Sequence, residues 1–148
     1  MTNENTAASI PEPSSSRRPA SLKEVALLGA RGGDIDAGLR EFLDEFYVAD
    51  ESRRASMLAD EPQMLEDERA NAYLAAVAEH LSLRYALPRV GWVNEPQRFL
   101  HRPYFPAGLE SLKATFLKES PTAFRRRLIF VDANPLSRPR QVSRGFGA

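Results

Sequence analysis

The chain has 148 residues, of which 43% are hydrophobic and 9% aromatic, so it fits one domain with a real core. It contains no cysteine, which excludes disulfide bonds, thiolate metal sites and cysteine nucleophiles and fits a reducing compartment. No stretch approaches the roughly 20 apolar residues that span a bilayer, and the N-terminus lacks the apolar core of a secretory signal. We therefore expect a cytoplasmic protein with no membrane partner.

Lysine plus arginine and aspartate plus glutamate each total 20, which argues against an overall electrostatic attraction to DNA or anionic lipid. The distribution is uneven. Residues 34–68 hold twelve acidic residues against three arginines, whereas residues 84–148 hold twelve basic residues against four acidic ones. This asymmetry has three interpretations. The two regions are solvated faces packed together in one domain, or they drive head-to-tail self-association or intramolecular closure. In the third interpretation they are separate acidic and basic docking faces.

The N-terminal part begins with a polar, proline-containing segment. Residues 1–20 contain one large aliphatic side chain, Ile10, and are predicted to be a disordered leader. Ser21 and Glu24 then form a capping box, which predicts a short helix that ends at Gly32-Gly33.

Asp34 is the predicted N-cap of a second helix, because the residues after it form a helical apolar stripe. The stripe consists of Ile35, Leu39, Phe42, Leu43, Phe46 and Tyr47. The opposite face carries Asp36, Arg40, Glu41, Asp44 and Glu45. It is either an ordinary solvated face or an acidic docking surface.

Two further helices are predicted, a weaker one over residues 51–59 and a long one over residues 65–86. The long segment combines helical apolar periodicity with alanines that permit close packing, and Pro88 ends it. We expect this to be the central helix.

Seven prolines between residues 88 and 139 restrict the C-terminal part to short elements. Short helices are expected over residues 96–100, 109–118 and 122–127, the last with Ser120 as N-cap and Pro121 at its first position. Residues 128–131 form the one strand-like run. The sequence thus predicts a single helical domain over residues 21–138 and a flexible basic tail over residues 139–148.

Catalytic and metal-binding motifs are missing from the sequence. The two histidines, His80 and His101, are too few and too far apart for a zinc site, and no phosphate-binding or nucleophile-elbow motif is present. We expect a non-enzymatic protein without metal or cofactor. A third hypothesis is an enzyme of unrecognised type, and its first sign would be a buried His80 or His101 with a strongly shifted pKa that faces a pocket.

Three consecutive arginines, Arg125, Arg126 and Arg127, are the segment most suggestive of function. Three interpretations are open: the arginines form internal ion pairs, contact phosphates, or dock onto an acidic protein. Guanidinium groups suit all three. Arg138, Arg140 and Arg144 add to a nucleic-acid interpretation, whereas the acidic second helix argues against a helix-turn-helix.

Aromatic residues cluster in the same half of the chain. Trp92, Phe99, Tyr104 and Phe105 lie within fourteen residues and either fill the core beneath proline-rich loops or anchor an interface.

Several segments between residues 65 and 138 resemble a bacterial domain of unknown function. They are Ala72-Tyr-Leu-Ala-Ala-Val-Ala-Glu-His-Leu81, Leu87-Pro88, Trp92, Glu95-Pro96-x-Arg98-Phe99-Leu100, Pro103-x-Phe105, Glu119-Ser-Pro-Thr-Ala-Phe-Arg-Arg-Arg127, Ile129-Phe130-Val131 and Leu136-Ser137-Arg138. That family resembles the C-terminal part of some helix-turn-helix regulators and is often encoded beside nucleotidyltransferase-like toxin genes. The resemblance implies a toxin–antitoxin or regulatory context and no catalytic residues. The first sixty residues do not resemble the regulators' DNA-binding domain.

Taken together, the sequence predicts a mainly α fold, with a small helical domain built on one central long helix, short proline-punctuated C-terminal elements and a disordered N-terminal leader. The predicted function is a non-enzymatic, antitoxin-like interaction with a cognate protein. The predicted partner-binding residues are Asp36, Glu41, Asp44, Glu45, Arg125, Arg126 and Arg127. The alternative is a nucleic-acid-binding regulator that uses the arginine cluster.

Overall fold

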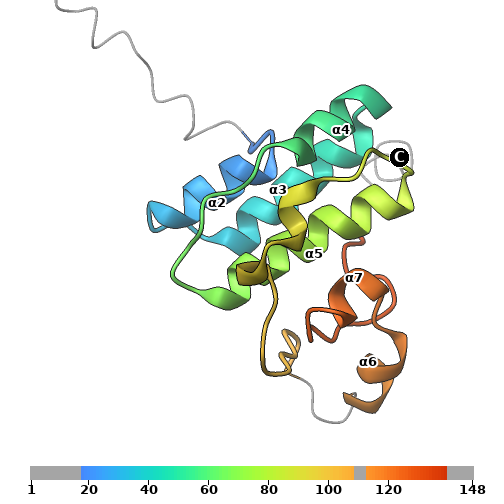
Figure 1. The fold of residues 1–148 in the computed structure, drawn as a ribbon. Coiled ribbons are helices and arrows are strands. Elements are labelled where there is room, and N and C mark those ends of the chain that lie inside the picture. Colours follow the sequence, from blue (N-terminus) through green and yellow to red (C-terminus); the bar gives the residue numbers. More distant parts are fainter. Residues whose placement is uncertain (1–17, 109–112, 140–148) are drawn as a thin grey trace, which may run out of the picture.

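The computed structural model describes residues 18–108 and 113–139, and this part of the chain is mainly helical, as predicted (Figure 1). It contains six α-helices, two short 3-10 helices and no strand. The α-helices are α2 (Leu22–Ala30), α3 (Ile35–Val48), α4 (Glu51–Ala59), α5 (Glu68–Arg84), α6 (Lys113–Glu119) and α7 (Thr122–Arg125). Residues 1–17, most of the predicted leader, and residues 140–148 of the predicted tail lie outside the described residues.

Helix α2 begins and ends as its sequence predicts. The Ser21 hydroxyl accepts a hydrogen bond from the backbone N–H of Glu24, as in a capping box, and the Glu24 carboxylate reaches back one residue further, to the N–H of Ala20. Gly32 adopts a φ of +88°, and the N–H of Gly33 donates to the carbonyl of Leu28, so the helix ends in a Schellman motif.

The folded part begins before residue 21, earlier than predicted. Pro19 is buried, and the Arg18 guanidinium forms an ion pair with the Glu45 carboxylate on α3 at 3.2 Å. Residues 18–20 therefore pack against the helices and do not belong to a leader.

Helices α3 and α5 run parallel and form the centre of the core, to which α2, α4 and the C-terminal half also add residues. Their first turns line one cavity and their last turns line another at the opposite end of the molecule. Phe42 and Phe46 of α3 are fully buried, and α5 packs with a small-residue surface that includes Ala72, Ala75 and Ala76. Close packing of these alanines explains why α5 tolerates burial on nearly all sides.

In the N-terminal half, the observed bounds of the helices lie close to the predicted ones. α4 has the predicted range, with the Asp50 carboxylate accepting from the N–H of Arg53. α5 begins at Glu68, three residues later than predicted, because Asp67 is its N-cap. It ends at Arg84, because Ala86 has a φ of +54° and the chain turns before Pro88.

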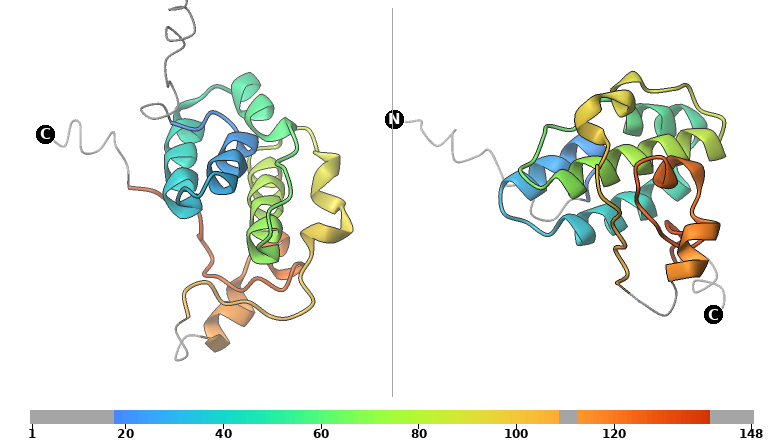
Figure 2. Two further views of the ribbon diagram at one scale, coloured as in Figure 1. Left: turned by 90° about the vertical axis from the view of Figure 1, so that its left-hand side faces the viewer. Right: turned by 60° about the horizontal axis from the view of Figure 1, so that its bottom comes forward.

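The C-terminal half wraps around α5. The 3-10 helices η2 (Gly91–Asn94) and η3 (Pro96–Arg98) and helix α7 all pack against α5, and α6 lies beyond α7 (Figure 2). Trp92 is buried, and its indole N–H donates to the carbonyl of Leu58 on α4 at 3.1 Å. Trp92 is thus a core residue, the first of the two alternatives for this aromatic cluster.

Three predictions for the C-terminal half need correction. Residues 128–131 are not a strand: Leu128 has a φ of +64°, and the segment forms one isolated bridge, between Tyr104 and Ile129. α7 ends at Arg125, two residues early, and its N-cap is Pro121, which leaves the Ser120 hydroxyl to accept from the N–H of Val131 at 2.8 Å. The expected helix over residues 96–100 is the shorter η3, and of residues 109–118 only 113–118 are described, all within α6.

Candidate functional site

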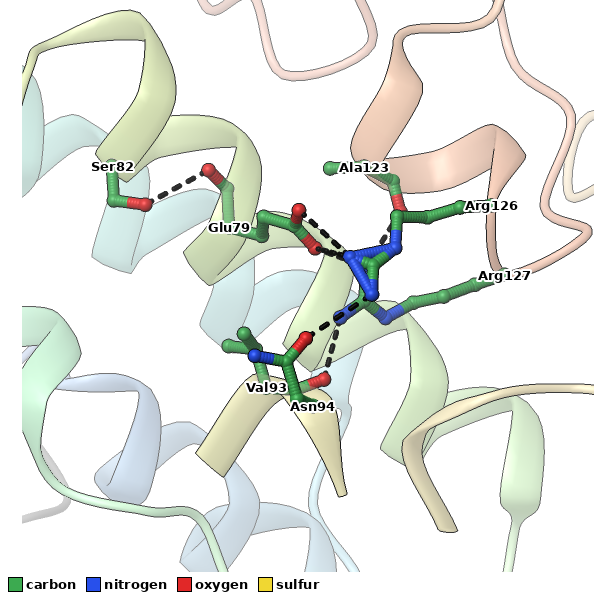
Figure 3. Close-up of polar contacts among 7 residues, drawn as sticks. All are labelled: Glu79, Ser82, Val93, Asn94, Ala123, Arg126 and Arg127. Carbon is green, nitrogen blue, oxygen red and sulfur yellow. Dashed lines mark hydrogen bonds and ion pairs between the residues drawn. The ribbon is translucent and has the colours of Figure 1, made fainter. Parts of the chain in front are cut away.

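The last residue of the arginine cluster is buried. Arg127 has no exposed surface, and its guanidinium donates to the Glu79 carboxylate of α5 at 2.6 Å and to the carbonyls of Val93 and Ala123 at 2.6 and 2.8 Å (Figure 3). Burial lowers the pKa of Arg127, and the Glu79 hydrogen bond opposes that shift. Arg127 therefore joins α5, α7 and η2 inside the protein and is not placed to contact a partner.

The two other arginines of the cluster lie at the surface but are also bonded within the chain. Arg126 donates to the Glu79 carboxylate at 3.1 and 3.3 Å and to the Asn94 side chain at 3.1 Å. Arg125 donates to the backbone carbonyls of Lys118 and Ser120, at the end of α6. Of the three interpretations of the arginine cluster, the structure thus supports the first, in which the arginines bond within the protein.

A second buried arginine was not singled out by the sequence. Arg98 is fully buried, donates to the carbonyls of Pro62 and Asn71 at 2.6 and 3.3 Å, and lies 4.9 Å from the centre of the Trp92 ring. Its ion-pair partner is Glu61, at 3.3 Å. No sequence signal separates Arg98 from an ordinary loop arginine, because its partners lie 27 and more residues earlier.

The four acidic residues predicted to bind a partner divide into two pairs. Asp44 forms a two-pronged ion pair with Arg138, at 3.0 and 3.3 Å, and Glu45 pairs with Arg18. Asp36 and Glu41 are exposed and form no ion pair with any residue in the described ranges. The part of this face that remains available for a basic partner is therefore its N-terminal half.

Further carboxylates adjoin Asp36 at this end of the molecule. Asp34 and Asp67, the N-caps of α3 and α5, line a cavity of about 240 Å³ together with Asp36, and Tyr73 forms part of its wall. Burial, followed by the charge of Asp36, raises the pKa of Tyr73 to about 12. Arg69, also in the wall, stacks over the ring of Tyr104. We call the exposed carboxylates Asp34, Asp36 and Asp67 of this cavity, together with Glu41 in the middle of α3, the acidic end.

The opposite end of α3 and α5 carries a basic groove of about 500 Å³. Its charged residues are Arg54, Arg84, Arg138 and Asp44, and its apolar wall includes Tyr47, Val48 and Tyr85. The Arg54 side chain caps α3 by donating to the carbonyls of Phe46 and Tyr47, both at 2.9 Å. No sequence signal groups the residues of this groove, because they come from three distant segments of the chain.

The two histidines lie in different surroundings. His80 is partly buried and lies 5.7 Å, centroid to centroid, from the ring of Phe124, and burial followed by the nearby Arg84 charge lowers its pKa. His101 is exposed in a loop and lines an open cavity together with Asp67 and Glu68. Within residues 18–108 and 113–139, no three carboxylate or imidazole groups are close enough to hold a metal ion.

Comparison with known proteins adds no assignment, because no protein-family model, curated protein or solved structure matches this chain. Across the described segments, no helix has the length and apolar character needed to span a bilayer.

Proposed function

We propose that this chain is a non-enzymatic interaction domain that binds a basic surface of a cognate protein through its acidic end, in the manner of an antitoxin. The observation that carries the proposal is the contrast between the two charged regions predicted from sequence. The guanidinium groups of Arg125, Arg126 and Arg127 are bonded within the protein, whereas the carboxylates of Asp36 and Glu41 face solvent without an ion-pair partner in the described part.

The chemistry of the acidic end suits a lysine or arginine side chain of a partner. Three carboxylates and one cation, Arg69, line a cavity of a size that accepts one such side chain, so its lining is net negative, and Tyr73 supplies an apolar wall for the methylene groups. The first turns of α3 and α5 are also where exposed carboxylates cost the fold least, because the helix dipoles favour negative charge there. An acidic surface can therefore be maintained at this end without destabilising the domain.

The alternative, a nucleic-acid-binding regulator, draws less support from the geometry. A phosphate contact by the arginine cluster would require Arg126 or Arg125 to leave its internal partners, and Arg127 is fully buried. Arg138, which also contributed to that interpretation, pairs with Asp44.

The test is affinity capture of the tagged chain from its host after nuclease treatment, with the captured proteins quantified by mass spectrometry. We expect one protein at near-stoichiometric yield that is lost from the Asp36→Lys, Glu41→Lys double variant. Glu119→Lys, an equally exposed reversal on α6, is the matched control and should capture as the wild type does. Capture that survives the double variant, or recovery of nucleic acid alone before nuclease treatment, would overturn the proposal.

A further inference from the structure

We propose that the chain self-associates head to tail, with the acidic segment of one copy, residues 60–68, occupying the basic groove of the next. This inference goes beyond the proposed function: the groove is not part of the acidic end, and Asp67 is the one residue that the acidic segment shares with it.

The groove has positive charge available for a ligand. Arg84 is exposed and contacts the ring of Tyr85 without a carboxylate partner among the described residues. Arg54 and Arg138 each use Nε and Nη2 for their internal bonds, which leaves Nη1 of each in the groove wall. Asp44 offsets one of the three guanidinium charges. The groove is therefore net positive.

The groove also has an apolar wall that suits a protein segment better than a nucleotide. Val48 is 71% exposed at the end of α3, where an aliphatic or methionine side chain can cover it. Base stacking on Tyr85 is hindered, because the guanidinium carbons of Arg54 and Arg84 already lie 4.5 and 5.9 Å from the centre of that ring. The occupant with the best chemistry is thus an acidic peptide segment that carries an apolar side chain.

The segment between α4 and α5 has this composition. It reads Asp-Glu-Pro-Gln-Met-Leu-Glu-Asp-Glu, is largely irregular and exposed, and presents Met64 with 38% of its surface accessible. Asp60 and Glu66 are exposed and have no ion-pair partner in the described ranges. Glu61 pairs with Arg98 and Asp67 caps α5, so the charges of Asp60 and Glu66, together with Met64, are those that match the arginines and the Val48 wall of the groove.

The last residues of the acidic segment lie far from the groove of the same copy. The groove lies at the last turns of α3 and α5, whereas the acidic segment leads to the first turn of α5 at the other end (Figure 1). The 17 residues of α5 separate the two ends by roughly 24 Å. One copy therefore cannot fill its own groove with residues 66–68, and a contact through these residues joins one copy to the next as a heterologous interface.

Sedimentation velocity on the full chain tests this inference, over concentrations up to about 1 mM, where weak contacts become populated. At low ionic strength we expect the weight-average sedimentation coefficient to rise with concentration without a plateau at the dimer. At about 0.5 M salt it should return to the monomer value, because exposed charges are then screened. Arg84→Glu and the double variant Asp60→Lys, Glu66→Lys should each remain monomeric. Lys23→Glu, an exposed reversal on α2, is the matched control and should associate as the wild type does.

An equimolar mixture of the two monomeric variants gives the decisive result. One retains the acidic segment and the other retains the groove, so the mixture should form one-to-one dimers and no larger species. A wild type that stays monomeric throughout, or a mixture that does not dimerise, would refute the inference. Because Arg84→Glu leaves the acidic end intact, it should not reduce partner capture, which separates failure of this inference from failure of the proposed function.

Discussion

Removing the Glu79 carboxylate should destabilise the fold far more than removing its exposed partner. Glu79 is the counter-charge of Arg127, which has no exposed surface, and breaking a buried pair by deleting one member costs about 3–5 kcal/mol. The Glu79 side chain is 17% exposed, so we expect Glu79→Ala to lie near the lower limit, about 3 kcal/mol. Arg126 is 37% exposed, and Arg126→Ala should cost less than about 1 kcal/mol.

The assay is urea denaturation followed by the fluorescence of Trp92, which is buried and is the one tryptophan of the chain. With a slope of about 1.5 kcal/mol per molar urea, Glu79→Ala should lower the midpoint by roughly 2 M. Glu79→Gln keeps an acceptor oxygen for Arg127 but loses the charge, and should fall between the other two variants. Equal, small shifts for Glu79→Ala and Arg126→Ala would refute the reasoning, because Arg127 would then not depend on its counter-charge.

Three further changes test local features of the fold. Ala86→Gly should raise the free energy of unfolding by about 1 kcal/mol, because Ala86 is exposed and holds a φ of +54° that glycine adopts without strain; a thermal melt would show it. Ser120→Ala should cost about 1–3 kcal/mol in urea denaturation, since the buried N–H of Val131 loses its acceptor, whereas Ser120→Thr should retain part of the stability. Burial lowers the pKa of His80, so the imidazole of the unfolded chain binds a proton more readily than that of the folded chain. The free energy of unfolding should therefore fall as the pH drops below about 6.5. His80→Gln should reduce the difference in urea midpoint between pH 7.5 and 5.5, and an unchanged difference would contradict the assignment.

The helices of the N-terminal half were predictable because their signals are local. Ser21 with Glu24, Asp34 before an apolar stripe, and Gly32-Gly33 each act within one turn of the residues that they affect. The strand predicted at residues 128–131 failed because strand formation depends on a partner. The segment around Tyr104 offers one bridging position, and Leu128 turns the chain away from an extended run.

The bonding partners of the charged side chains were the feature least predictable from the sequence. Arg127 meets a carboxylate 48 residues earlier, and Arg98 meets carbonyls up to 36 residues earlier, so no window of sequence contains both partners. Three consecutive arginines suggested a binding surface, whereas the burial of Arg127 and the internal bonds of Arg125 and Arg126 follow from the packing of α7 on α5. Conversely, Arg54, Arg84 and Arg138 meet in one groove although nothing in the sequence groups them.

The central claim, that exposed carboxylates at the acidic end bind a basic partner, is tested most directly by titrating the purified partner against the chain by calorimetry at increasing salt. We expect the affinity to fall steeply with salt and to drop at least about tenfold for the Asp36→Lys, Glu41→Lys variant, with Glu119→Lys unchanged. An affinity that is the same for all three proteins and insensitive to salt would contradict the account.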